Sequence, residues 1–138
     1  MLTKSWPCQR NKRKRGLGRL VVTWITRQPQ AGLAQGRLHA GSVALRCALG
    51  RAGVSQAKRE GDHATPSGTF RLLGVFFRRD RLPRPALLLP ARELKPNEGW
   101  CDDPASALYN RLVTLPCRAR HEKLWRADRL YDLVIVID

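Results

Sequence analysis

The apolar segments of this 138-residue sequence are short, which limits the kind of core that the chain can form. The longest of them, at residues 75–77, 86–89 and 133–137, have the length of β-strands. None approaches the roughly 18 residues that a membrane-spanning helix needs, and no long stretch has the spacing of an amphipathic helix. The sequence therefore predicts a mainly β fold with long loops and little helix.

Several segments carry strand signatures, because they are rich in β-branched, aromatic or alternating apolar residues. They are residues 20–26, 37–48 with a break at Gly41 and Ser42, 69–77, 86–93, 111–115 and 130–137. Residues 86–93 contain a proline, which suits an edge strand at best. Residues 130–137 are apolar over most of their length, which predicts burial on both faces of that strand. Turn-forming residues fill 96–104, and we expect one helical turn within residues 121–126.

The composition divides the sequence into a basic lead at residues 1–18 and one domain at residues 19–138. We expect the lead to be disordered, because residues 12–15 are all Lys or Arg and repel one another. The formal net charge is +15, from 26 Lys and Arg against 11 Asp and Glu. Such a field attracts nucleic acid, acidic lipid or wall polymers, but we interpret the arginines as solvated residues scattered over the surface.

The four cysteines, Cys8, Cys47, Cys101 and Cys117, form no C-x-x-C pair and no spacing typical of a disulfide scaffold. A structural zinc site needs four nitrogen or sulfur ligands in close-spaced pairs. Cys117 and His121 are the one close pair, so we expect no metal site. No motif for an organic cofactor is present either, and we expect none.

The segment E-G-D-H-A-T-P-S-G-T-F, at residues 60–70, concentrates turn chemistry just before a predicted strand. Glycine tolerates positive φ at Gly61 and Gly68, while Pro66 fixes its own φ and holds Thr65 extended. The segment thus predicts a rigid loop that leads directly into the strand, which is a good platform for binding residues. The alternative is a β-turn that has no function of its own.

A second candidate segment, G-W-C-D-D-P at residues 99–104, is followed by Tyr109 and Asn110. Trp100 is either an aromatic of a binding groove or a core residue. Asp102 either holds a substrate or caps a turn. Tyr109 and Asn110 either orient a peptide through hydrogen bonds or close a turn.

Taken in order, these segments resemble the L,D-transpeptidase (YkuD-like) family of cell-wall enzymes. The likeness covers roughly residues 38–138 and includes C-A-L-G-R-A-G at 47–53, T-P-S-G at 65–68 and H-E-K-L-W-R at 121–126. It implies a mixed β-sandwich and an acyl transfer, in which a Cys thiolate attacks a peptidoglycan stem peptide and an amine resolves the thioester. The residues to which the likeness assigns substrate binding are Asp62, Thr65, Pro66, Gly68, Trp100, Asp102, Tyr109 and Asn110.

The catalytic residues of that family are not found in the matching segments. In the family, the catalytic His and a Ser/Thr-x-Gly-Cys loop follow the strand that corresponds to residues 133–137, and this sequence ends at Asp138. We therefore expect an incomplete sandwich, the N-terminal portion of the family domain, with no catalytic residues and no activity. Cys101 is the best placed cysteine but lacks a base, and the likeness does not place the catalytic His at His121. Residues 133–137 would form an unpaired edge, through which we expect self-association.

Two alternatives from other classes stay open. A non-catalytic module that binds peptidoglycan or protein would keep the substrate loop without turnover. A basic nucleic-acid-binding β-domain would explain the net charge, but no recognised binding motif supports it, so nucleic acid is not the favoured partner. The family acts in the cell envelope, whereas residues 1–34 give no convincing signal peptide, so the sequence does not fix the localisation.

Overall fold

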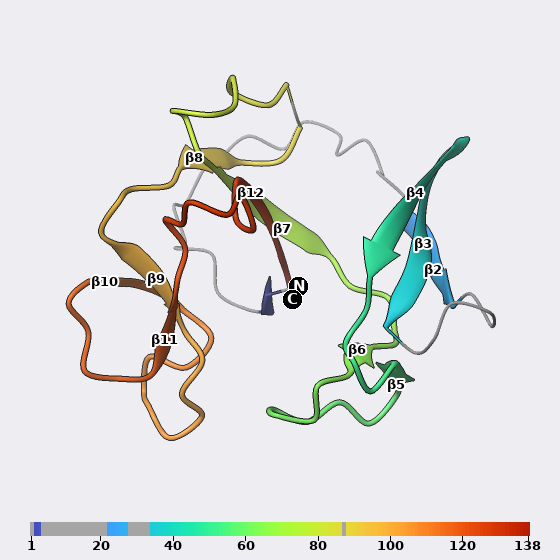
Figure 1. Ribbon diagram of the computed structural model, residues 1–138, viewed down its shortest axis with the longest axis horizontal. Coiled ribbons are helices and arrows are strands. Elements are labelled where there is room, and N and C mark those ends of the chain that lie inside the picture. Colours follow the sequence, from blue (N-terminus) through green and yellow to red (C-terminus); the bar gives the residue numbers. More distant parts are fainter. Residues whose placement is uncertain (1, 4–21, 28–33, 87) are drawn as a thin grey trace, which may run out of the picture. The chain divides into compact units, whose positions relative to one another are not determined.

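The computed structural model describes residues 2–3, 22–27, 34–86 and 88–138 (Figure 1). Every regular element in these ranges is a β-strand, which confirms the prediction of a mainly β fold. The same ranges contain no helix of the length and hydropathy that would cross a membrane. The strands belong to two compact units, an N-terminal unit of residues 16–69 and a C-terminal unit of residues 1–15 with 70–138. Apart from Leu2 and Thr3, the predicted basic lead lies outside the described residues.

The N-terminal unit contains an antiparallel sheet in the order β2-β3-β4. Its strands are β2 (Val22–Arg27), β3 (Gln35–Ala40) and β4 (Val43–Ala48). Gly41 has a φ of 59° in the two-residue turn between β3 and β4, a conformation that glycine adopts without steric cost. The prediction of strands at residues 37–48, with the break at Gly41, is therefore confirmed. The strand predicted at residues 20–26 is confirmed from Val22 onward, and residues 20 and 21 lie outside the described residues.

A two-stranded sheet in the same unit fixes the ends of the loop at residues 56–64. Its strands are β5 (Val54–Ser55) and β6 (Thr65–Pro66), which pair in parallel. Backbone hydrogen bonds extend the pairing, because the N–H of Ser67 donates to the carbonyl oxygen of Ser55 at 2.8 Å. The two ends of the loop are therefore held side by side.

The C-terminal unit contains a four-stranded mixed sheet in the order β1-β12-β7-β8. Its strands are β1 (Leu2–Thr3), β12 (Leu133–Ile137), β7 (Leu72–Phe77) and β8 (Ala91–Glu93). β12 runs antiparallel to β7, and β8 runs parallel to β7 at one edge of the sheet. On its other side β12 pairs with β1 at Val136 and Ile137. This half of β12 is therefore not the unpaired edge that the sequence predicted.

The C-terminal unit also contains a three-stranded antiparallel sheet. Its central strand lies within residues 96–104, where the sequence predicted a turn. Its order is β10 (Leu112–Thr114), β9 (Glu98–Cys101) and β11 (His121–Lys123). Gly99, which favoured the turn prediction, sits in the central strand because a Cβ there would lie 2.8 Å from the carbonyl oxygen of Glu122. The helical turn predicted at residues 121–126 is also wrong, because its first residues pair with β9.

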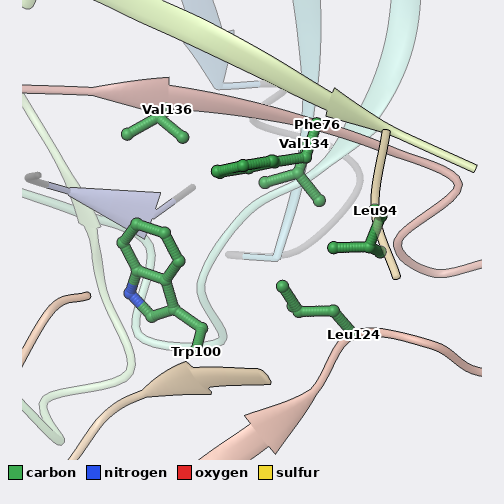
Figure 2. Close-up of a cluster of buried hydrophobic side chains, with 6 residues drawn as sticks. All are labelled: Phe76, Leu94, Trp100, Leu124, Val134 and Val136. Atoms are coloured by element: carbon green, nitrogen blue, oxygen red, sulfur yellow. The ribbon is translucent and has the colours of Figure 1, made fainter. Parts of the chain in front are cut away.

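The core of the C-terminal unit lies where its two sheets meet (Figure 2). Its buried members are Phe76, Leu94, Trp100, Leu124, Val134 and Val136. Trp100 projects from β9 toward the strands of the mixed sheet. On the opposite face of β12, Leu133 and Ile135 are 44% and 38% exposed. The predicted burial of this strand on both faces is therefore wrong along most of its length, and the strand alternates between core and surface instead.

Candidate functional site

Asp62, the first of the predicted substrate residues, is fixed inside its own loop. Its carboxylate accepts hydrogen bonds from the backbone N–H of Arg59 at 2.7 Å and from that of Ala64 at 2.9 Å. It also lies 2.7 Å from Nζ of Lys58. The Arg59 N–H first, and then the Lys58 ammonium and the Ala64 N–H, favour the charged form and lower the pKa of Asp62 to about 2. The carboxylate therefore closes this loop as an anion at neutral pH.

Thr65 joins the loop to the turn between β4 and β5. Its Oγ1 accepts a hydrogen bond from the N–H of Gly50 at 2.8 Å, and its own N–H donates to the carbonyl oxygen of Gly53 at 2.8 Å. Gly50 has no room for a side chain, because a Cβ would lie 2.2 Å from the carbonyl oxygen of His63. The segments 49–53 and 62–65 are therefore in direct contact and form one compact platform.

The exposed part of this platform is the end of the T-P-S-G segment. Pro66 is half-buried, and Ser67 and Gly68 are exposed. Asp62 and Thr65 use their side-chain oxygens for the loop's own hydrogen bonds. A ligand that docked here would therefore meet the ring of Pro66 and the backbone at Ser67 and Gly68.

Trp100 and Asn110, both predicted to bind substrate, are brought together by the structure. The indole Nε1 of Trp100 donates a hydrogen bond to Oδ1 of Asn110 at 3.1 Å. Asn110 has a φ of 62° and donates its backbone N–H to the carbonyl oxygen of Cys101 at 2.8 Å. Trp100 is 1% exposed and belongs to the core. The structure thus favours the alternative of a core tryptophan, with Asn110 as the partner that satisfies its buried N–H.

Asp102 and Tyr109 lie at the surface end of the same segment. Both are half-buried. Asp102 forms an ion pair with Nε of Arg120 at 3.2 Å. Asp103, beside it, accepts a hydrogen bond from the N–H of Ala105 at 3.0 Å, which is the usual turn chemistry of aspartate. Together, Asp102 and Tyr109 give this end of β9 a polar and aromatic surface that a peptide can contact.

Cys101 and His121 are direct cross-strand partners on β9 and β11. Residues opposite each other in an antiparallel pair place their side chains on the same face, so the thiol and the imidazole are neighbours. The Nδ1 atom of His121 lies 2.8 Å from the carbonyl oxygen of Ala119, which orients the ring. Cys101, however, is fully buried. A thiol nucleophile needs access to its substrate, so this pair is not an open acyl-transfer site.

Arg78 is a buried charged residue, unlike the solvated surface arginines that the sequence predicted. Its Nε and Nη2 donate to the carboxylate of Asp80 at 2.8 and 2.7 Å, and its Nη1 donates to the carbonyl oxygen of Arg126 at 2.9 Å. Its guanidinium carbon lies 3.5 Å from the ring centroid of Trp125. Arg78 is 3% exposed and fastens the end of β7 to the segment that follows β11.

The predicted binding residues thus fall into two groups, one in each compact unit. Asp62, Thr65, Pro66 and Gly68 belong to the N-terminal unit, and Trp100, Asp102, Tyr109 and Asn110 belong to the C-terminal unit. Within the described ranges, no cluster of three or more His, Cys, Asp or Glu residues could hold a metal ion. Comparison of the chain with protein-family models, with curated proteins and with solved structures found no match.

Proposed function

We propose that this chain is an L,D-transpeptidase-like (YkuD-like) protein that binds the stem peptides of peptidoglycan. The observation that carries the proposal is the ordered set of segments at residues 47–53, 60–70, 99–104 and 121–126. A mainly β fold is compatible with the mixed β-sandwich of that family. The net charge of +15 supports it as well, because stem peptides carry carboxylates that a positive field attracts.

In this proposal the surface end of β9 supplies the peptide contacts of the C-terminal unit. Asp102 and Tyr109 are half-buried there and can offer an acceptor and a phenol to a peptide backbone. Trp100 and Asn110 support Asp102 and Tyr109 from the core side, because the hydrogen bond between them holds the segment from Cys101 onward in place. Asp62 and Thr65 have the same supporting role in the N-terminal unit, beneath Pro66.

We further propose that this chain binds stem peptides without turning them over. Acyl transfer needs an ionised thiol that a peptide carbonyl can reach, with a base beside it and donors for the oxyanion. Among the described cysteines, Cys101 has an imidazole neighbour but is buried. Cys47 and Cys117 are half-buried. This distribution favours the non-catalytic binding module over an acyltransferase.

The proposal is tested by calorimetric titration of the chain with a synthetic stem tetrapeptide, and by sedimentation with purified peptidoglycan. Tyr109→Phe removes one hydroxyl, whose hydrogen bond is worth about 0.5–1.5 kcal/mol, so binding should weaken roughly two- to tenfold. Leu108→Ala, a change of an exposed neighbour, is the control and should leave binding unchanged. Failure of the wild-type chain to bind either ligand would overturn the proposal.

Absence of turnover needs a separate measurement. After incubation with the stem tetrapeptide and an amine acceptor, intact-mass spectrometry should show neither an acyl adduct on the chain nor a cross-linked product. An adduct that disappears in Cys101→Ser would show that the buried thiol becomes accessible, and would restore the acyltransferase alternative.

A further inference from the structure

The positive charge of this chain is concentrated before Glu60, whereas the proposed function uses only the net charge of the whole chain. Glu60 is the first acidic residue of the sequence, so thirteen of the 26 Lys and Arg precede it and none of the 11 Asp and Glu does. Residues 1–59 therefore carry +13 of the formal +15. A charge asymmetry of this kind is typical of chains that bind a polyanion.

Within this acid-free part, the structure pairs two arginines directly across a sheet. Arg37 on β3 and Arg46 on β4 are register partners. Direct partners in an antiparallel pair have Cβ atoms about 4.5–5.5 Å apart and side chains on the same face. Both arginines are exposed. Two guanidinium groups are therefore presented to solvent side by side, where the sequence suggested only scattered arginines.

This arrangement is unfavourable unless an anion joins it. Like charges that face each other across a sheet destabilise the pair. The side chains of Arg37 and Arg46 have no hydrogen bond or ion pair with another described residue. The carboxylate of Asp62, in the same unit, already forms an ion pair with Lys58 and accepts hydrogen bonds from two backbone N–H groups. An external anion that bridges the two guanidinium groups would remove the repulsion.

On β3 and β4, the rest of that sheet face is polar or small. Alternation along β3 and β4 places Gln35, Ala44 and Ala48 on it, with His39 next to Arg37 on the same side. The exposed apolar residues of β4, Val43 and Leu45, belong to the opposite face. On these two strands the face has no large apolar side chain to insert between lipid tails, which argues against a membrane surface as its partner.

We propose that Arg37 and Arg46 form a binding site for the phosphates of single-stranded nucleic acid. The guanidinium fork matches phosphate oxygens in pairs, so neighbouring arginines can hold one phosphate or two successive ones. A basic sheet face can follow the backbone of a single strand, whose phosphates are spaced along it.

The test is fluorescence anisotropy of a labelled 20-residue oligothymidylate titrated with the full chain at several chloride concentrations. Two phosphate contacts on a single strand contribute about 1.4 to the slope of log K against log salt. Arg37→Gln with Arg46→Gln should therefore weaken binding at low salt at least several-fold and flatten the slope by about this amount. Oligoadenylate should bind similarly, because phosphate contacts carry no sequence information.

The matched control is Arg84→Gln with Arg118→Gln, which removes the same charge from two exposed arginines of the C-terminal unit. If both double variants lose affinity equally, the chain attracts nucleic acid through its net charge, and the site is refuted. Arg46→Glu separates binding from folding. It places opposite charges across the strand pair and should keep the melting temperature while binding is lost.

Two further arms identify the ligand. Polyglutamate that bound with the same dependence on Arg37 and Arg46 would show that the site recognises charge rather than phosphate, and would overturn the proposal. Binding to vesicles of phosphatidylserine and phosphatidylcholine, in place of the oligonucleotide, would overturn it in favour of a membrane. Binding of stem peptides by Arg37→Gln with Arg46→Gln should equal that of the charge-matched Arg84→Gln with Arg118→Gln control, so that this proposal and the proposed function fail separately.

Discussion

The carboxylate of Asp62 closes its loop through three donors, and its titration is a direct test of that closure. Because the pKa of Asp62 in the folded chain is about 2, below its ordinary value of 3.8, the charged form is the one that folding favours. The stabilisation is therefore complete above about pH 4 and is lost as the pH falls toward 2. Amide NMR shifts of Arg59 and Ala64 should titrate with a midpoint near 2.

The control for this titration is Asp62→Asn, which keeps the size of the side chain and removes the ionisation. The acid transition at Arg59 and Ala64 should vanish in this variant, and both amides should exchange faster with solvent at neutral pH. A midpoint near 3.8 in the wild-type chain would instead show a carboxylate that is solvated and does not close the loop.

Arg78 provides a second test at the scale of one residue. Arg78→Met keeps much of the apolar stem but removes the donors to Asp80 and to the carbonyl oxygen of Arg126. Hydrogen bonds to charged groups are worth about 1.5–3 kcal/mol, so we expect a loss of this order in the free energy of unfolding. Urea denaturation measures it.

The conservative variant Arg78→Lys discriminates between charge and geometry at this position. A lysine keeps the charge but cannot reproduce the bidentate fork or the stacking on Trp125. It should therefore restore only a minor part of the lost stability. Full rescue by Lys would show that the charge alone matters, and that the planar contacts are incidental.

Among the elements, local patterns predicted the strands that are specified locally. The hairpin of β3 and β4 is an example, because Gly41 allows its tight turn and both strands adjoin it in sequence. β9 was missed because Pro96, Gly99 and Pro104 imitate a turn. Its pairing is non-local, with partners on β10 and β11, and Gly99 is a strand residue only because the backbone at Glu122 approaches it. Such an approach cannot be inferred from sequence spacing.

The packing of β7 against β12 can be tested at Phe76, which pairs with Val134 and is 1% exposed. Phe76→Ala removes a ring from the core of Figure 2 and should lower the free energy of unfolding by about 3–5 kcal/mol, through lost burial and the cavity left behind. Thermal and urea denaturation measure the change. Leu88→Ala, at a site 80% exposed, is the control and should change the free energy of unfolding by less than about 0.5 kcal/mol. Equal effects would show that the two sheets do not share a packed core.

At the scale of the whole molecule, the candidate site was only partly foreseeable. The sequence located the turn chemistry around Pro66 and the polar segment after Trp100, because residue types signal both. It left open whether Trp100 is a core residue, because burial is decided by the sheets that meet there. The register of Arg37 with Arg46 was also hidden, although the absence of acids before Glu60 can be read directly from the sequence and favours an anionic partner.

The net charge predicts how the stability of the whole chain depends on salt. Eight ion pairs join described residues, and salt weakens them, but those between exposed side chains are worth only about 0–1 kcal/mol each. Against them stands the mutual repulsion within a net charge of +15, which salt also screens. We expect repulsion to prevail, so that raising sodium chloride from about 0.01 to 0.15 M raises the melting temperature. The melting temperature of the variant Arg84→Gln with Arg118→Gln should rise less steeply with salt, because less net charge remains to be screened. A melting temperature that falls with added chloride would show that the ion pairs outweigh the net repulsion.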